Sequence, residues 1–70
     1  MQAGNFNLTV ERIGDDGFYR MVVANGAGRR WAQKNGSPEP DNIGEAMIET
    51  AWNIGEGGKL NADYWVEVAA

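Results

Sequence analysis

The stretch FNLTVERIGDDGFYRMVVA, residues 6–24, decides the fold. Every second residue from Phe6 to Val10 is apolar, which is typical of a strand with one buried face. Residues 18–24 are rich in aromatic and β-branched side chains, so they predict a second strand. Gly14-Asp15-Asp16-Gly17 lies between the two strands and is a strong turn signal. The stretch therefore predicts an antiparallel hairpin.

A third strand, a helix and a last strand follow the hairpin. Asn25-Gly26 suits a two-residue type I′ turn, which leads into a strand over residues 28–33. After a proline-containing loop, residues 41–55 predict a helix, and residues 64–69 alternate as a strand does. The apolar stripe of the helix follows i, i+3, i+4 spacing and consists of Ile43, Ala46, Met47, Thr50, Ala51 and Ile54.

These elements predict one α+β domain over residues 1–70, with the order β-β-β-α-β. An antiparallel sheet with one helix packed on one face satisfies the layering of small domains. The last strand is expected at an edge of the same sheet. Asn42 and Glu45 fit a capping box at the helix start, with Asp41 as the competing cap. Gly55, Gly57 and Gly58 are the candidate C-caps.

The composition argues against several classes of protein. The chain has 70 residues and contains neither cysteine nor histidine. Disulfides, Cys/His zinc sites and the usual nucleophile–base pairs are therefore excluded. We expect no catalytic residue, no metal and no cofactor, and a protein that is not an enzyme. No apolar run is long enough to span a membrane and no signal peptide is evident, so we expect a cytoplasmic protein in its host cell.

Charge is unevenly distributed along the chain, whose net charge is -4. Residues 17–38 contain four cations and no acid, whereas residues 39–70 contain seven acids and only Lys59 as a cation. In one interpretation the opposite charges meet across the fold and serve solubility. In the other, two charged faces steer partners and set specificity.

The two predicted turns fix which side chains share a face of the sheet. They place Val10 opposite Met21 and Leu8 opposite Val23, giving one apolar face for the helix. The same register puts Trp31 in a row with Glu11 and Arg20 on the other face. That second face is a candidate binding surface made of Phe18, Arg20, Arg29 and Trp31. It has the aromatic and basic character of single-strand nucleic-acid platforms, although Arg20 over Trp31 is equally a structural cation–π pair.

The helix has a second candidate surface, turned away from its core stripe. Ile48 and Trp52 form an i, i+4 apolar pair bordered by Glu45, Glu49 and Glu56. Such an apolar pair with an acidic border is a plausible contact patch for a protein partner. The alternative is that Trp52 wraps around the edge of the core and the glutamates form a solvated face.

Protein binding is the function that these features favour most. One version is homodimerisation through the open sheet face or an edge strand. Another is inhibition of a nucleic-acid-handling complex, in which an acidic surface competes for a groove that normally holds nucleic acid. Direct nucleic-acid binding is disfavoured by the net negative charge and the small number of cations.

Two families resemble this sequence. Its size, acidity and element order resemble the small phage and prophage anti-CRISPR proteins that inhibit type I systems. The local similarity lies in Val10-Glu11-Arg12 before a turn, and in the helix from Glu45-Ala46-Met47 through Ala51-Trp52 to Gly55. This resemblance implies a partner among the Cas proteins of a surveillance complex, and a block of target DNA recognition or nuclease recruitment.

The second resemblance is to the HicB-like antitoxins. A strand, an acidic-glycine-aromatic turn, a strand and an amphipathic helix are similar over Val10 to Ile54, with Asp15-Asp16-Gly17-Phe18-Tyr19 as the turn. This resemblance implies an antitoxin-like module.

Overall fold

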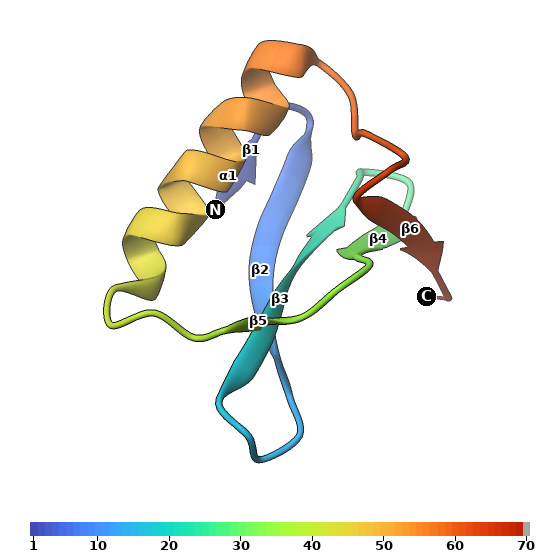
Figure 1. Ribbon diagram of the computed structural model, residues 1–70. Helices are drawn as coiled ribbons and strands as arrows, with labels where there is room; N and C mark the ends of the chain where they lie inside the picture. The colour runs from blue at the N-terminus through green and yellow to red at the C-terminus, as the bar shows by residue number, and fades with distance from the viewer. Residues whose placement is uncertain (70) are drawn as a thin grey trace.

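A computed structural model of the protein describes residues 1–69 (Figure 1). It is an antiparallel sheet with one helix against one face, as the sequence predicts, and the sheet has six strands where four were expected. The strand order is β1-β2-β3-β4-β6, with β5 pairing with β3. The elements are β1 (Gln2–Ala3), β2 (Phe6–Ile13), β3 (Phe18–Ala24), β4 (Arg30–Gln33), β5 (Ser37–Pro38), α1 (Ile43–Gly57) and β6 (Trp65–Val68).

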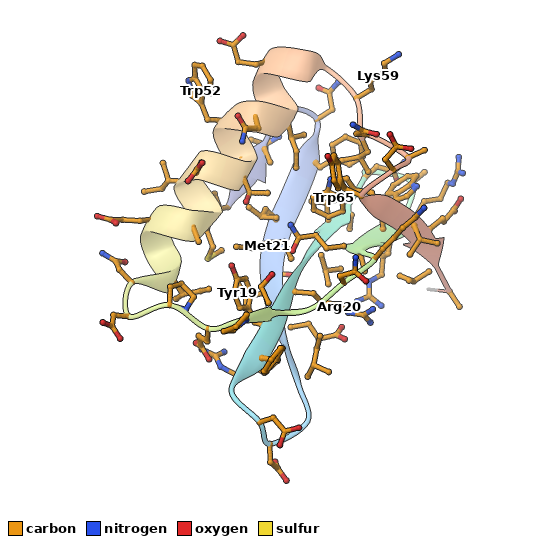
Figure 2. The ribbon with its side chains drawn as sticks, in the orientation of Figure 1. Tyr19, Arg20, Met21, Trp52, Lys59 and Trp65 are labelled. Carbon is orange, nitrogen blue, oxygen red and sulfur yellow. The ribbon has the colours of Figure 1, made fainter. Side chains whose placement is uncertain are left out.

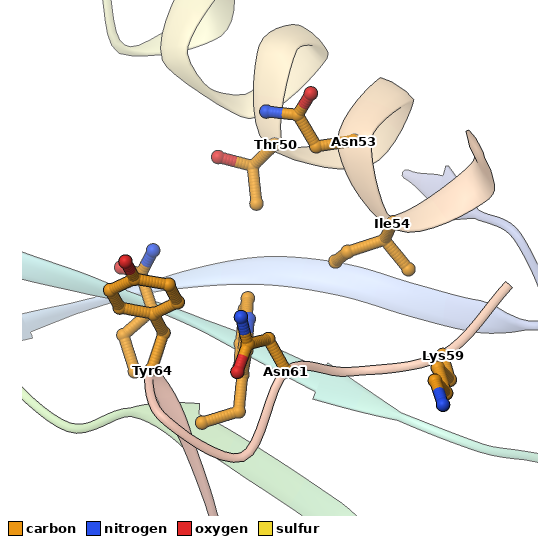
Figure 3. Close-up of a pocket in the computed structure, with 8 residues that line it drawn as sticks. Thr50, Asn53, Ile54, Lys59, Asn61 and Tyr64 are labelled. Carbon is orange, nitrogen blue, oxygen red and sulfur yellow. The ribbon is translucent and has the colours of Figure 1, made fainter. Parts of the chain in front are cut away.

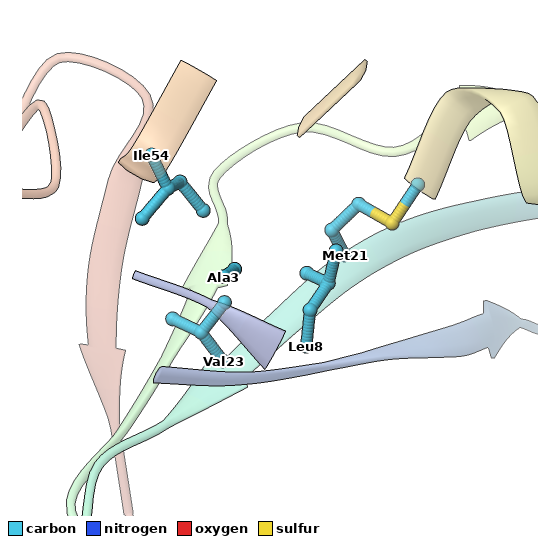
Figure 4. Close-up of a cluster of buried hydrophobic side chains, with 5 residues drawn as sticks. All are labelled: Ala3, Leu8, Met21, Val23 and Ile54. Carbon is cyan, nitrogen blue, oxygen red and sulfur yellow. The ribbon is translucent and has the colours of Figure 1, made fainter. Parts of the chain in front are cut away.

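The central hairpin has the predicted register. Val10 lies opposite Met21 and Leu8 opposite Val23 in the β2–β3 ladder. Leu8, Met21 and Val23 are also the largest fully buried side chains. They meet Ala3 and Ile54 in the core beneath the helix, as Figure 4 shows. The alternation of the hairpin therefore locates the core correctly.

The predicted register between β3 and β4 is wrong. The sequence interpretation places Trp31 beside Arg20, but Trp31 lies opposite Val23, a shift of three residues. The connection is not a two-residue turn at Asn25-Gly26, because it runs through residues 25–29. The carboxamide of Asn25 accepts hydrogen bonds from two backbone N–H groups of this loop, those of Ala27 and Arg29, and Gly28 takes the positive φ of 84°.

This shift moves Trp31 to the other side of the sheet. A strand presents alternate residues to opposite faces, so a displacement by an odd number of residues exchanges them. Trp31 consequently packs on the core face, where its ring meets that of Phe6 edge-on with centroids 5.5 Å apart.

Two short strands were not predicted. Gln2 and Ala3 pair with the start of β2, and Ala3 is buried. Ser37 and Pro38 lie in the predicted loop over residues 34–40, yet they pair with Tyr19 and Phe18. Between the two partners of β3, the side chain of Gln33 accepts the N–H of Met21 at 2.9 Å. The long edge of β3 is thus covered by β4, a side chain and β5 in turn.

The helix is close to the predicted one, but begins and ends two residues later. Asn42 is the N-cap, and its side chain accepts the N–H of Glu45 at 3.3 Å. Gly58 is the C-cap: it adopts a left-handed φ of 71° and its N–H donates to the carbonyl of Ile54. Both caps are among the predicted candidates.

The helix covers only part of the sheet. It packs against β1 and β2, and Figure 1 shows it on the side of the molecule away from β6. Leu60, in the loop after the helix, joins Trp31 and Trp65 against the core. On the opposite face of the sheet, which the helix does not cover, Ile13, Phe18 and Val66 are exposed. Within residues 1–69, no helix is long and apolar enough to cross a membrane.

Candidate functional site

The outward face of α1 brings together all five residues of the predicted helix patch. At 3.6 residues per turn they fall within an arc of about 100°, opposite the core stripe. We call this surface the acidic strip; it consists of Glu45, Ile48, Glu49, Trp52 and Glu56, and each is exposed. From its first to its last residue the strip runs about 16 Å along the helix.

The two apolar side chains of the acidic strip are unusually open to solvent. Ile48 is 60% exposed and Trp52 is 64% exposed. Figure 2 shows Trp52 directed away from the sheet. The alternative interpretation, in which Trp52 wraps around the edge of the core, is therefore wrong. Because both side chains stay in water, the folded state does not gain the free energy that their burial would contribute.

The three glutamates of the acidic strip have no cationic partner within residues 1–69. Glu45 lies in the first turn, where a negative charge suits the helix dipole, but the other two glutamates are placed unfavourably for the helix. Glu45 and Glu49 are an i, i+4 pair of like charge. Glu56 adds negative charge to the last turn, where the helix dipole is already negative and no basic residue is present. The local stability of α1 therefore gives a reason for Glu45 but none for Glu49 or Glu56.

The second predicted surface does not form one face. Phe18 and Arg20 lie on the face that the helix leaves uncovered, with Phe18 exposed. Trp31 lies on the core face, and Arg29 lies in the loop before β4. The predicted cation–π pair between Arg20 and Trp31 is also wrong. The guanidinium over the Trp31 ring is that of Arg29, which lies 5.1 Å from the ring centroid.

Arginines from the basic segment are engaged with carboxylates. Arg20 pairs with Glu11 at 2.8 Å, on the uncovered face of the sheet. Arg29 donates two hydrogen bonds to Glu67 of β6. The hydrogen bond from Arg29 lowers the pKa of the Glu67 carboxyl, and the same bond raises the pKa of Arg29. Two of the four cations of this segment, Arg20 and Arg29, are therefore paired with carboxylates of the same chain.

A pair between distant segments supports the interpretation in which opposite charges meet across the fold. Arg12, at the end of β2, binds Glu39 through two hydrogen bonds. Like the Arg29–Glu67 pair, it joins the acidic C-terminal half to the sheet. The acidic strip differs from these carboxylates, because it keeps its charge directed to solvent.

Sequence reasoning missed a cavity between α1 and β6. Its lining comes from the helix, from β4 and from the loop that precedes β6, as Figure 3 shows. One of its eight lining residues, Gln33 of β4, is far from the others in sequence, so no local motif connects the whole set. The other seven fall within residues 50–65, but they are divided among the helix, the loop after it and β6, and they carry no pattern that indicates a site.

Comparisons with known proteins give no relative for this chain. No protein-family model, no curated protein and no solved structure matches it.

Proposed function

We propose that this protein is a non-enzymatic, protein-binding inhibitor that docks through the acidic strip of α1. The single observation that carries the proposal is that three unpaired carboxylates surround an exposed tryptophan and isoleucine. The fold gains little from either feature, since the apolar groups stay in water and two of the three charges, those of Glu49 and Glu56, oppose the helix. A partner surface with an apolar pocket and basic side chains would bury the two apolar groups and neutralise the carboxylates.

The complementary partner is a basic protein surface with an apolar pocket. Trp52 would be the anchor that enters the pocket, since buried tryptophans are among the strongest contributors to protein interfaces. Glu45, Glu49 and Glu56 would form the rim, where charges guide association and select the partner. A basic groove of this kind is what a protein uses to hold nucleic acid.

The partner class that best fits is a nucleoprotein complex. By its resemblance to the phage anti-CRISPR proteins, we propose a Cas protein of a type I surveillance complex, bound in the cytoplasm of the host cell. The acidic strip would occupy a basic groove and block recognition of target DNA. A standard interface buries about 800 Å² on each partner, roughly a sixth of the 4731 Å² surface of this protein. The contact would therefore extend beyond the strip onto neighbouring loops.

Fluorescence anisotropy of a labelled target duplex tests this function. A purified type I surveillance complex is assembled with its guide RNA and titrated into the duplex, with and without an excess of this protein. The proposal predicts that the protein raises the apparent Kd for the duplex. It also predicts that a strip variant, Glu45→Lys, Glu49→Lys and Trp52→Ala, does not.

A second variant controls for the change in net charge. Asp15→Lys with Asp16→Lys alters the charge by the same amount at an exposed turn, far from the helix patch along the chain. This variant should inhibit like the original protein. Inhibition by the strip variant as strong as that by the original protein, or no inhibition by either, would contradict the proposal.

A further inference from the structure

A cavity of about 330 Å³ lies between the second half of α1 and the start of β6 (Figure 3). It exists because the helix packs over β1 and β2, so the loop after the helix must bridge to the far strands. The volume is at the lower end of the range for small-molecule sites, about 300–1,000 Å³. Its lining residues are Gln33, Thr50, Asn53, Ile54, Lys59, Asn61, Tyr64 and Trp65.

The side-chain amide oxygens of two lining residues already accept hydrogen bonds from the backbone. The side-chain oxygen of Gln33 accepts the N–H of Met21 at 2.9 Å, and that of Asn61 accepts the N–H of Asp63 at 2.9 Å. Each amide group therefore keeps both N–H donors of its NH₂ group for a ligand, while one of the two lone pairs on its oxygen is already used. In Figure 3 the Asn61 nitrogen lies on the side of the group nearer the helix. The backbone hydrogen bonds thus set the orientation of both amide groups.

The charge of the lining is the reverse of its surroundings. Residues 39–70 contain seven acids and one cation, yet no acid lines the cavity, and the cation, Lys59, does. Lys59 makes no ion pair within residues 1–69. A donor-rich lining with one ammonium and no carboxylate complements an oxyanion.

The remaining lining favours a flat apolar group. Tyr64 and Trp65 present aromatic rings, and Ile54 adds an aliphatic surface from the helix. Aromatic rings pack well against another ring in an offset or edge-on arrangement. We propose that this cavity binds a small aromatic molecule carrying a carboxylate or a phosphate. The oxyanion would be held by the NH₂ groups of Gln33 and Asn61, with Lys59 at the edge of the cavity (Figure 2) adding long-range attraction, and the ring by Tyr64 and Trp65.

Three probes with one ring and different head groups test this site: benzoate, phenyl phosphate and neutral benzamide. Binding is followed by ¹⁵N NMR of the ¹⁵N-labelled protein through the side-chain NH₂ signals of Gln33 and Asn61 and the indole N–H of Trp65. We expect benzoate or phenyl phosphate to shift these signals, and benzamide to bind at least roughly tenfold more weakly because it lacks the charge. The tighter of the two anions identifies the head group.

Asn61→Asp is the decisive variant. It keeps the oxygen that accepts the Asp63 N–H, so the loop is preserved, but it replaces the donor by a carboxylate. Affinity for the anionic probes should fall at least roughly tenfold. Asn5→Asp adds the same charge in the exposed turn between β1 and β2 and should leave affinity unchanged.

Three results would overturn the assignment. The first is the absence of shifts at these signals with millimolar anionic probes. The second is equal binding of benzamide and the anions. The third is unchanged affinity in a folded Asn61→Asp variant.

Discussion

Gly58 stops the helix through its backbone conformation. Its φ of 71° lies in the left-handed region, and its N–H donates to the Ile54 carbonyl at 2.9 Å. A side chain at such a φ costs about 1–2 kcal/mol, so we expect Gly58→Ala to lower the free energy of unfolding by about 1 kcal/mol. Gly57→Ala, at the last helical residue, should instead raise it by up to about 1 kcal/mol. Urea denaturation measures both, and a similar effect of the two variants would contradict the role of the cap.

The Arg29–Glu67 pair makes a residue-level prediction about pH. The hydrogen bond from Arg29 holds the pKa of Glu67 below its ordinary value. The pair therefore contributes stability above the ordinary glutamate pKa, and this contribution disappears as the pH falls through the lowered value in the folded protein. In an NMR titration of the Glu67 carboxyl, Arg29→Gln should move the midpoint upward. An unchanged midpoint would show that the ion pair does not form in solution.

At the level of elements, α1 carries two charges, those of Glu49 and Glu56, that oppose its own stability. Glu49→Lys changes a repulsive i, i+4 pair into an attractive one, and Glu56→Lys places a cation at the negative end of the dipole. We expect the two changes together to raise the free energy of unfolding by about 0.5–1.5 kcal/mol and, if the acidic strip is a docking surface, to weaken partner binding. Thermal unfolding measures the first effect. A loss of stability would mean that the glutamates support the helix in a way the structure does not show.

Some elements of this fold could be predicted from the sequence and others could not. The β2–β3 hairpin and α1 were predictable because their signals are local: alternation, a turn flanked by glycines and an apolar stripe. The β3–β4 connection was not, because its length depends on the Asn25 side chain accepting two loop N–H groups. That one interaction moves Trp31 to the core face and divides the second candidate surface. The acidic strip was predictable, because it depends only on helical spacing.

For the whole molecule, the charge pattern has two components. Arg12–Glu39 and Arg29–Glu67 join segments 27 and 38 residues apart, so part of the acidic half is neutralised within the fold. The acidic strip remains directed outward, on the far side of the helix from the sheet. One small domain thus has some carboxylates that are paired with arginines of the same chain, and one surface, the acidic strip, that carries only negative charge. Such a surface attracts a basic partner over a distance of about a Debye length, near 8 Å at physiological salt.

The affinity of a type I surveillance complex for the fluorescently labelled protein tests the central claim most directly. The variant Glu45→Lys, Glu49→Lys, Trp52→Ala is compared with the original protein and with Asp15→Lys, Asp16→Lys, after circular dichroism has shown that all three are folded. Loss of an anchoring tryptophan and two rim charges should weaken binding roughly 100-fold or more, while the turn variant stays within about threefold of the original. Equal affinities of the folded strip variant and the original protein would contradict the claim that the acidic strip is the docking surface.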